Sequence, residues 1–256
     1  MKISVVTVTL NRAKDLCQTL QSVLGQTYDD WEYIVVDGGS SDNTVAELRK
    51  AECLFGDRLR WISEPDNGIY DAMNKGVALA QGDVVGFLGS GDVFFDEFSL
   101  QSLADSFRRY DVKAVFADLI LVDPENTDRV TRYWHGSPYS PGIFNKGWQP
   151  AHPTFYVRRE CFSLYGGFDT DLHISSDFDL MFRFLERERI SSRYIPRKLV
   201  RMLDGGESNA SLRNIMIAHR NIYRAFRKYG YKVPSLYSFR RLLPKIVNMI
   251  EARLLS

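Results

Sequence analysis

Residues 2–25, KISVVTVTLNRAKDLCQTLQSVLG, change their hydrophobic period partway along. The first eight residues are largely β-branched and apolar, which is typical of a strand buried on both faces. Apolar side chains then recur at helical spacing, and Gly25 follows as a residue that commonly ends a helix. These apolar positions are Ala13, Leu16, Leu20 and Leu24. The stretch therefore predicts a strand followed by a helix.

The same order recurs along the first third of the chain. Further strands are expected at 31–37, 58–63 and 83–88, with helices from about 41 to 51 and from 69 to 80. Such strands, separated by helices of about 10 to 15 residues, predict an α/β fold with a doubly wound, mostly parallel sheet and flanking helices. Ligands of such sheets bind at the carboxyl ends of the strands.

The pattern becomes less regular from about residue 113. Strand-like pieces are expected at 113–122, 129–134, 193–196 and 198–203, and helices at about 177–189, 210–229 and 236–255. Between them lies a Gly- and Pro-rich loop at 136–153. Long loops in compact domains are usually functional, so we expect its residues 136–150 to close over a ligand.

The composition is that of an ordinary globular protein. The 256 residues are 45% hydrophobic and 25% charged with a net charge of +1, which excludes disordered and fibrous proteins. No apolar run approaches the roughly 20 residues that cross a bilayer. Cys17, Cys53 and Cys161 are too few for a disulfide framework and suit a reducing compartment. We therefore expect a cytoplasmic protein.

The charges are unevenly distributed along the chain. Residues 1–180 carry 16 basic and 27 acidic side chains, whereas residues 181–256 carry 17 basic and 5 acidic ones. This asymmetry predicts carboxylates for chemistry or metal binding in the first part and an anionic partner for the last part. Nucleic acid is disfavoured as that partner, because the longer part is acidic and no nucleic-acid-binding motif is present.

One carboxylate falls at the end of a predicted strand in VVDGGSSD, residues 35–42. Asp37 there could accept hydrogen bonds from a ribose or a base edge, and the two glycines would let the backbone approach a ligand. The alternative is an aspartate that only forms a turn. A classical dinucleotide-binding loop is disfavoured, because the first strand is not followed by Gly-x-Gly-x-x-Gly.

Two further segments place polar groups at strand ends. EPDNGIYDAMNKG, residues 64–76, leads into a helix, where its acidic residues could simply complement the helix dipole. GFLGSGD, residues 86–92, delivers Asp92 beside flexible backbone, which suits a divalent cation that bridges to phosphate. Taken alone, the second segment could also be a β-turn.

Together these segments resemble the family 2 inverting glycosyltransferases of the GT-A fold. The resemblance rests on SVVTVTLNR, VVDGGSSD, EPDNGIYDAMNKG and GFLGSGD in that order, and it extends to ISSDFDL at residues 174–180. It is nearest to bacterial enzymes of surface polysaccharide or glycolipid biosynthesis. It implies a GT-A domain at 1–205, with a nucleotide-binding half at 1–112 and an acceptor half at 113–205, followed by a basic helical extension at 206–256.

The resemblance also implies roles for single residues. Asp37 would contact the uracil or ribose, and Asp92 matches the last acid of the family's Asp-x-Asp motif, which binds Mn²⁺ or Mg²⁺ on the donor diphosphate. Ser90 stands where the first acid is common, and one carboxylate with phosphate and water can still hold Mg²⁺. The implied donor-binding residues are Thr9, Asn11, Arg12, Asp37, Asp66, Asp71, Asn74, Lys75, Ser90 and Gly91.

The transfer itself needs a base near the acceptor hydroxyl. Asp177 matches the family's catalytic base, although Ser176 stands where Glu is common. The alternative is a helix start in which Asp177 caps the helix and Asp179 pairs with Arg183. The residues assigned to acceptor or sugar contact are Trp148, His152 and Asp179.

The basic segment near the carboxyl end has an amphipathic pattern. An apolar face is expected over Leu212, Ile215, Met216, His219, Ile222, Tyr223, Phe226 and Tyr229, beside a stripe of Arg213, Arg220, Arg224 and Arg227. Such a helix could lie on an anionic membrane, so we expect peripheral contact with the inner face of the plasma membrane through this segment and 236–255. The alternative is a helix that packs on the domain and exposes its arginines to water.

The predicted function is transfer of a sugar from a nucleotide-sugar donor, with UDP favoured, to a hydroxyl of a saccharide or lipid-linked acceptor in cell-surface glycan biosynthesis. A catalytically weak or inactive nucleotide-sugar-binding module is the alternative, with Ser90 and Ser176 as signs of decay. A nucleotidyltransferase is disfavoured by the missing Gly-rich loop. A processive synthase is disfavoured by the missing transmembrane helices and Gln-x-x-Arg-Trp motif.

Overall fold

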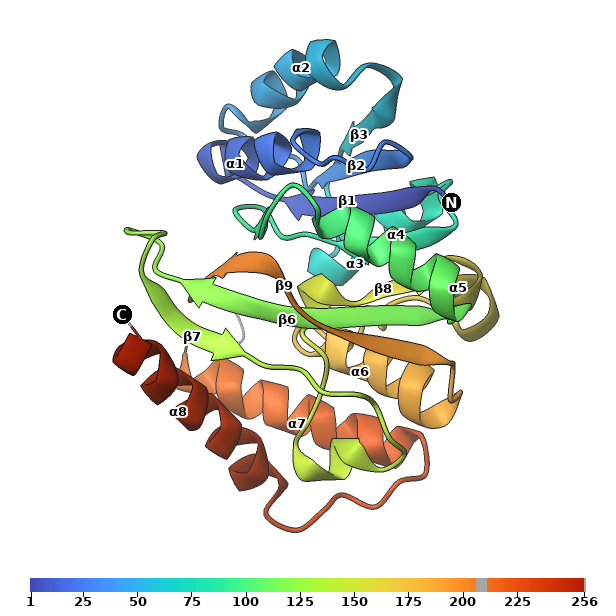
Figure 1. The fold of residues 1–256 in the computed structure, drawn as a ribbon, viewed down its shortest axis with the longest axis vertical. Helices are drawn as coiled ribbons and strands as arrows, with labels where there is room; N and C mark the ends of the chain where they lie inside the picture. Colours follow the sequence, from blue (N-terminus) through green and yellow to red (C-terminus); the bar gives the residue numbers. More distant parts are fainter. Residues whose placement is uncertain (206–210, 256) are drawn as a thin grey trace.

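The computed structural model describes residues 1–205 and 211–255 and shows one sheet flanked by helices on both faces (Figure 1). Within those residues the sheet has nine strands in the order β3-β2-β1-β4-β8-β6-β9-β5, with β7 paired to β6. The strands on the β3 side are parallel, and antiparallel pairs begin where β8 joins β4. The α/β fold class predicted from the sequence is confirmed.

The regular series of strands and helices in the first third of the chain is also confirmed. It comprises β1 (Ile3–Thr9), α1 (Ala13–Leu24), β2 (Trp31–Asp37), α2 (Thr44–Phe55), the short helix η1 (Gly56–Arg58), β3 (Leu59–Ser63), α3 (Ile69–Leu79) and β4 (Val84–Phe87). Strands β1, β2 and β4 are buried along nearly their whole length, as their continuous apolar sequences predict.

Two glycines allow unusually close packing at the sheet, one between a helix and a strand and one beneath an aromatic ring. A Cβ atom on Gly76 of α3 would lie 2.4 Å from a methyl carbon of Val6, so only glycine lets α3 lie this close to β1. A Cβ atom on Gly86 of β4 would lie 2.2 Å from the ring of Tyr156, which packs across the β4–β8 pair. Both glycines are therefore needed for close packing rather than for flexibility.

The second half of the chain combines longer strands with short helices. Its elements are β5 (Val93–Phe94), α4 (Ser99–Tyr110), β6 (Ala114–Val122), β7 (Val130–Trp134), η2 (Ile143–Lys146), η3 (His152–Thr154), β8 (Tyr156–Arg158), α5 (Glu160–Tyr165), α6 (Ser176–Phe182), the π-helical turn η4 (Arg183–Arg187) and β9 (Ser192–Leu203). The two strand-like pieces expected around Pro196 form the single strand β9. The ladder to β6 skips Pro196 and Arg197, because a bulge accommodates a residue that cannot donate a backbone hydrogen bond.

Two long helices, α7 (Leu212–Lys228) and α8 (Tyr237–Leu255), complete the described chain. In α7, Phe226 is fully buried and its ring centroid lies 4.7 Å from that of Phe182 in α6. Helix α8 packs along β7 and η2 (Figure 1). Met216, which the sequence predicts on the apolar face of α7, has a side chain that is 67% exposed. The predicted domain boundary at residue 206 stays a prediction.

Candidate active site

The carboxyl ends of β1 and β4 meet at one edge of the sheet. The Thr9 hydroxyl donates a hydrogen bond to Ser90 Oγ at 3.2 Å. Beside it, the backbone N–H of Gly91 donates to Thr19 Oγ1 at 2.9 Å, and Gly91 has a φ of +99° that favours glycine. The structure thus brings together three residues that the sequence assigned to the donor site from segments about 80 residues apart.

Asp37 ends β2 and is fully buried. Its carboxylate accepts hydrogen bonds from the backbone N–H and the hydroxyl of Ser40, and from the Ser63 hydroxyl at 2.6 Å. A Cβ atom on Gly38 would lie 2.6 Å from an Asp66 carboxylate oxygen, so this glycine lets Asp66 approach the end of β2. Asp37 and Asp66 therefore lie close together, and the turn already supplies hydrogen bonds to Asp37.

The loop after β1 is held by its own side chains. Asn11 has a φ of +52°, and its Oδ1 accepts a hydrogen bond from the Ser41 N–H at 2.8 Å. Arg12 donates to Asp15 at 2.8 Å, and its side chain is half exposed. Asn11 thus links the β1 and β2 loops, while the Arg12 guanidinium remains accessible at the same edge.

The residues of the EPDNGIYDAMNKG segment mostly bond to one another. Asp66 accepts from the Gly68 N–H at 2.8 Å, and Asp71 accepts from the Asn67 N–H at 3.0 Å. The Lys75 ammonium lies 2.9 Å from a Glu64 carboxylate oxygen and also donates to a backbone carbonyl. These contacts fix the turn before α3, and donor binding by Asp66, Asp71 and Lys75 stays a prediction.

Asn74 has a contact that the sequence did not indicate. Its side-chain amide donates to the Phe168 carbonyl at 2.9 Å, and its Oδ1 accepts from the Phe168 N–H at 2.8 Å. This pair of hydrogen bonds ties α3 to the loop that leads into α6. The geometry favours a structural role for Asn74, because both of its amide atoms are engaged.

Asp92 is buried at the point where β4 and β9 end. Its Oδ1 accepts a hydrogen bond from the Leu203 N–H at 3.1 Å. A Cβ atom on Gly89 would lie 2.6 Å from Oδ2, so only glycine lets the backbone at position 89 approach this oxygen so closely. Burial raises the pKa of Asp92 to about 6, partly opposed by hydrogen bonds from the backbone N–H groups of Leu203 and Gly89 and by the charge of Arg12.

This carboxylate fits a cation that takes most of its ligands from elsewhere. Among residues 1–205 and 211–255, no group of three or more His, Cys, Asp or Glu side chains is arranged to hold a metal ion. One carboxylate can hold Mn²⁺ or Mg²⁺ when donor phosphates and water complete the shell. Metal binding by Asp92, with Ser90 in place of the usual first acid, stays a prediction.

Asp177 lies in the first turn of α6, and tertiary contacts bring it to the end of β4. One carboxylate oxygen accepts a hydrogen bond from the Tyr70 hydroxyl at 3.3 Å. The His152 ring stacks on Phe87, the last residue of β4, with centroids 5.4 Å apart. Burial lowers the pKa of His152, and the nearby Asp177 charge opposes that shift. Asp177, Tyr70 and His152 therefore form one group.

Asp179, two residues further on, has a different environment. It is fully buried, accepts a hydrogen bond from the Tyr229 hydroxyl at 2.9 Å, and lies 3.4 Å from the Arg183 guanidinium and 3.5 Å from the Lys228 ammonium. The Arg183 contact is the i,i+4 pair that the sequence offered as the alternative to sugar contact. The structure favours this structural role, because a buried carboxylate with three partners is not accessible to a sugar.

Trp148 and the loop around it belong to an aromatic cluster. The Trp148 ring lies 5.3 Å from that of Phe144 and 5.7 Å from that of Phe116. The loop is also anchored at Gly142, whose N–H donates to Glu186 at 2.8 Å. These contacts favour a packing role for Trp148 and hold in place the loop that the sequence expected to close.

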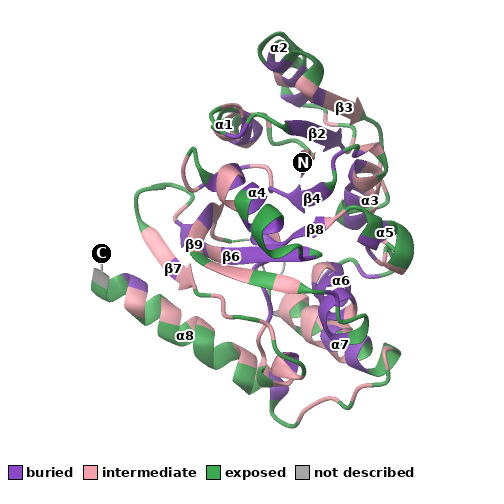
Figure 2. Cartoon of the chain, turned by 45° about the vertical axis from the view of Figure 1, so that its right-hand side comes forward, coloured by how far each residue is buried: buried purple, intermediate pink, exposed green. Residues whose placement is uncertain are grey.

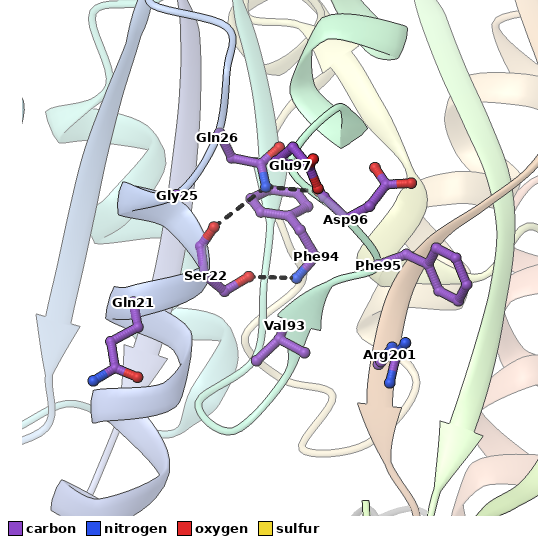
Figure 3. A pocket seen from close by; sticks show the side chains of 10 residues that line it. All are labelled: Gln21, Ser22, Gly25, Gln26, Val93, Phe94, Phe95, Asp96, Glu97 and Arg201. Carbon is purple, nitrogen blue, oxygen red and sulfur yellow. Dashed lines mark hydrogen bonds between the residues drawn. The ribbon is translucent and has the colours of Figure 1, made fainter. Parts of the chain in front are cut away.

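The structure contains a cavity of about 360 Å³ away from these residues (Figure 3). It lies between α1 and β5, where Ser22 accepts from the Phe94 N–H and Gln26 donates to the carbonyls of Ser22 and Asp96. None of the predicted site residues lines it. Its polar groups satisfy one another, so it has no feature of a catalytic site. A smaller cavity of about 210 Å³ includes Asp71 and lies at the start of α3.

Two residues near Asp177, Tyr70 and Arg241, were not predicted from the sequence as site residues. Tyr70 lies inside a segment that the sequence singled out, and burial, followed by the Asp177 charge, raises its pKa well above 10. Arg241 of α8 lies over the Phe178 ring at 5.6 Å, and the Asp177 charge acts on it. An arginine so far along the chain has no sequence signal that links it to the site, because only packing of α8 brings it there.

Solved structures place this arrangement in a known fold class. The chain is similar to TarS 1-349 of S. aureus in complex with UDP-GlcNAc, with a TM-score of 0.71 and 17% identity over 97% of this chain and 74% of that one. It is also similar to the mannosyltransferase PcManGT of Pyrobaculum calidifontis in complex with GDP-Man and Mn²⁺, with a TM-score of 0.66 and 17% identity over 98% and 73%. The fold is that of the GT-A glycosyltransferases.

Sequence relatives identify the family. Residues 4–166 match the model of glycosyl transferase family 2, and the chain belongs to this family. An uncharacterized glycosyltransferase of Mycobacterium tuberculosis (strain ATCC 25618 / H37Rv) is 33% identical over 71% of this chain and 68% of its own length. A PGL/p-HBAD biosynthesis glycosyltransferase of Mycobacterium bovis (strain BCG / Pasteur 1173P2) is 29% identical over 75% and 73%. The protein is a glycosyltransferase.

Proposed function

We propose that this glycosyltransferase moves a sugar from a UDP-sugar to a hydroxyl of a saccharide or lipid-linked acceptor in cell-surface glycan biosynthesis, with inversion at the anomeric carbon. The observation that carries the proposal is the position of Asp177 beside His152, whose ring stacks on the end of β4. The Asp177 carboxylate accepts a hydrogen bond from Tyr70, and Phe87, on which His152 stacks, precedes Ser90 and Asp92 in the chain. The UDP-GlcNAc complex of TarS and the PGL/p-HBAD relative support the donor and acceptor classes.

The chemistry follows from the charges at this edge. The acceptor hydroxyl would donate to Asp177, which takes its proton while the oxygen attacks the anomeric carbon. The bond between that carbon and the diphosphate oxygen breaks, and the nucleoside diphosphate leaves with the electron pair. A divalent cation held by Asp92, when bound, would neutralise charge on the diphosphate. His152 would be neutral near pH 7, because burial lowers its pKa, and it would contact substrate by hydrogen bonding.

The donor proposal is tested by thermal unfolding with UDP, GDP or dTDP, each with and without Mn²⁺. A ligand that binds only the folded protein stabilises it by about 2.7 kcal/mol at 100 times its dissociation constant. We expect the largest shift with UDP and Mn²⁺, and loss of the Mn²⁺-dependent part in Asp92→Asn. Asp105→Asn, which changes an exposed carboxylate on α4, should behave as wild type. A full Mn²⁺-dependent shift in Asp92→Asn would exclude Asp92 as the metal ligand.

We further propose that the protein is cytoplasmic and contacts the inner face of the plasma membrane peripherally. No helix in the described parts of the chain, 1–205 and 211–255, is long and apolar enough to cross a membrane. The outward face of α8 is apolar, with Val247 61% and Ile250 52% exposed, and exposed Arg240 could meet anionic headgroups. The arginine stripe of α7 is exposed as expected and would add to this attraction.

Flotation with vesicles of phosphatidylglycerol tests the membrane contact. Wild type should float with the vesicles, and Val247→Asp/Ile250→Asp should remain at the bottom of the gradient. Vesicles of phosphatidylcholine alone should bind less protein, because the electrostatic part is missing. Equal flotation of the variant and wild type would exclude the α8 face.

A further inference from the structure

Helix α8 exposes most of its apolar side chains and turns polar and charged ones toward the protein. Figure 2 shows the helix with exposed residues along its length and half-buried ones between them. Its inward positions, which are buried or half-buried, are Tyr237, Ser238, Arg241, Lys245, Asn248, Glu251 and Ala252. Its exposed apolar positions include Phe239, Leu242, Leu243, Ile246, Val247, Met249, Ile250 and Leu254. Helices of soluble proteins normally bury the apolar face. The inward orientation of the cations on α8 is therefore unusual and requires a physical explanation.

Arg241 and Lys245 belong to a group of basic side chains from three elements. Arg132 of β7 is 9% exposed, and His219 of α7 accepts or donates a hydrogen bond to Ser238 of α8 at 3.1 Å. Burial, followed by the charges of Arg241 and Lys245, lowers the pKa of His219. Burial, followed by the charges of Arg241 and Arg132, lowers the pKa of Lys245 to about 8. We call Arg132, His219, Arg241 and Lys245 the basic cluster.

The cations of the basic cluster are not neutralised by ion pairs. Within residues 1–205 and 211–255, Arg132, Arg241 and Lys245 form no ion pair with a carboxylate. The carboxylates that act on them from a distance are Asp177, on Arg241, and Asp204, on Arg132 and Lys245. Burying charge without a partner is unfavourable, so three cations against two distant carboxylates favour binding of one anion.

We propose that the basic cluster binds a phosphate group of the acceptor. The guanidinium groups of Arg132 and Arg241 suit the oxygens of a phosphate, and Lys245 adds a point charge. Of the members of the basic cluster, Arg241 lies over the ring of Phe178, the residue after Asp177, which in the proposed transfer receives the proton of the acceptor hydroxyl. The exposed face of α8 on the opposite side of the helix is apolar.

A second source of phosphate is the diphosphate of the donor. The donor edge is built from Thr9, Asp37 and Ser90, on β1, β2 and the loop after β4, whereas the cluster comes from β7, α7 and α8. This separation favours the acceptor. The inference rests on the proposed transfer function, so its test measures nucleotide binding separately from phosphate binding.

The test uses isothermal titration calorimetry of the full chain with octyl phosphate in metal-free buffer, and with UDP in the presence of Mn²⁺. We expect octyl phosphate to bind wild type and to bind Arg241→Gln/Lys245→Gln at least 10-fold more weakly. UDP should bind both proteins equally. Octyl glucoside, which has the same tail and an uncharged head, should bind neither protein at the concentrations used.

A matched control removes one arginine and one lysine elsewhere. Arg49→Gln/Lys50→Gln changes two exposed residues of α2 and should bind octyl phosphate as wild type does. The charge-retaining variant Arg241→Lys/Lys245→Arg should recover most of the binding, which separates loss of charge from misfolding.

Three outcomes would overturn the inference. Octyl phosphate could fail to bind wild type at millimolar concentration, or bind the glutamine variant equally well; either result removes the phosphate site. Loss of UDP affinity in Arg241→Gln/Lys245→Gln would assign the cluster to the donor diphosphate instead. Wild type that binds octyl phosphate but no nucleotide would contradict the proposed transfer function and leave the phosphate site standing.

Discussion

The buried carboxylate of Asp179 in α6 and the cations on the inner face of α8 differ in whether they have ion-pair partners. Asp179 has three partners, Arg183, Lys228 and Tyr229, so its charge is neutralised within one small network. The cations Arg241 and Lys245 have no ion-pair partner in the parts of the chain that the structure describes, 1–205 and 211–255. A buried charge with ion-pair partners holds the fold together, whereas we take one without such partners to mark a place for a ligand.

The presence of partners also distinguishes two aspartates that lie two residues apart, Asp177 and Asp179. Asp177 and Asp179 both lie in the first turn of α6, yet Asp177 forms no ion pair within residues 1–205 and 211–255 and accepts a hydrogen bond from Tyr70 at 3.3 Å. Glu32 of β2 resembles Asp179, because hydrogen bonds from Ser4 and Gln81 outweigh burial and lower its pKa. Asp177 and the cations Arg132, Arg241 and Lys245, which form no ion pair within residues 1–205 and 211–255, are among the residues to which we assign chemistry or binding.

The largest expected effect is on stability at the neutralised network. Asp179→Ala leaves the charge of Arg183 buried without its partner, which should lower the free energy of unfolding by about 3–5 kcal/mol. Urea denaturation of the variant and wild type measures this difference. A decrease of less than about 1 kcal/mol in the free energy of unfolding would contradict the contrast between Asp179 and the cations of α8, because the Asp179 network would then contribute little to stability.

The next effect concerns activity at Asp177. Asp177→Asn should lower turnover by about 10²-fold or more, equivalent to about 2.7 kcal/mol, because the base is removed. Nucleotide release from the UDP-sugar measures turnover, and calorimetry should give near wild-type UDP affinity. Retained turnover would exclude Asp177 as the base. Asp179→Asn serves as the matched variant two residues away, and it should affect stability more than turnover.

The third prediction is an increase in stability, in contrast to the decrease expected for Asp179→Ala. Lys245→Gln should raise the free energy of unfolding at pH 7 by about 1–3 kcal/mol, because it removes a charge whose pKa is lowered from 10.5 to about 8. In wild type the penalty is present below pH 8, declines as the folded-state lysine loses its proton, and is absent above 10.5. The advantage of the variant should therefore shrink between pH 8 and 10 in paired urea titrations. A variant less stable than wild type at pH 7 would mean that the charge is neutralised in the folded protein.

The smallest effect tests the hydrogen bond to Asp177. Tyr70→Phe removes the hydroxyl and should lower turnover by about 3- to 10-fold, in keeping with about 1 kcal/mol for one hydrogen bond. Turnover equal to that of wild type would show that Tyr70 affects packing only.

The sequence predicted the parallel half of the sheet well because its signals are local. Strands β1, β2 and β4 are largely apolar and buried, and the helices between them have their own apolar spacing, so neither signal depends on distant residues. The second half was harder, since Pro196 suggested a break in β9 that a bulge in the ladder removes. The side of α8 that faces the protein was also not evident, because the usual rule for amphipathic helices predicts the opposite orientation.

The sequence by itself determined the order of strands and helices, the family, and the candidates Asp37, Asp92 and Asp177, because motif and period are written along the chain. Tertiary structure alone decided which polar groups have partners. It pairs Asp179 with Arg183 and hydrogen-bonds Asn74 to Phe168. It also hydrogen-bonds Tyr70 to Asp177 and brings Arg241 of α8 near Asp177. The physical reason is that hydrogen bonding and charge compensation depend on distances in space, which residues far apart in the chain acquire only when the layers pack.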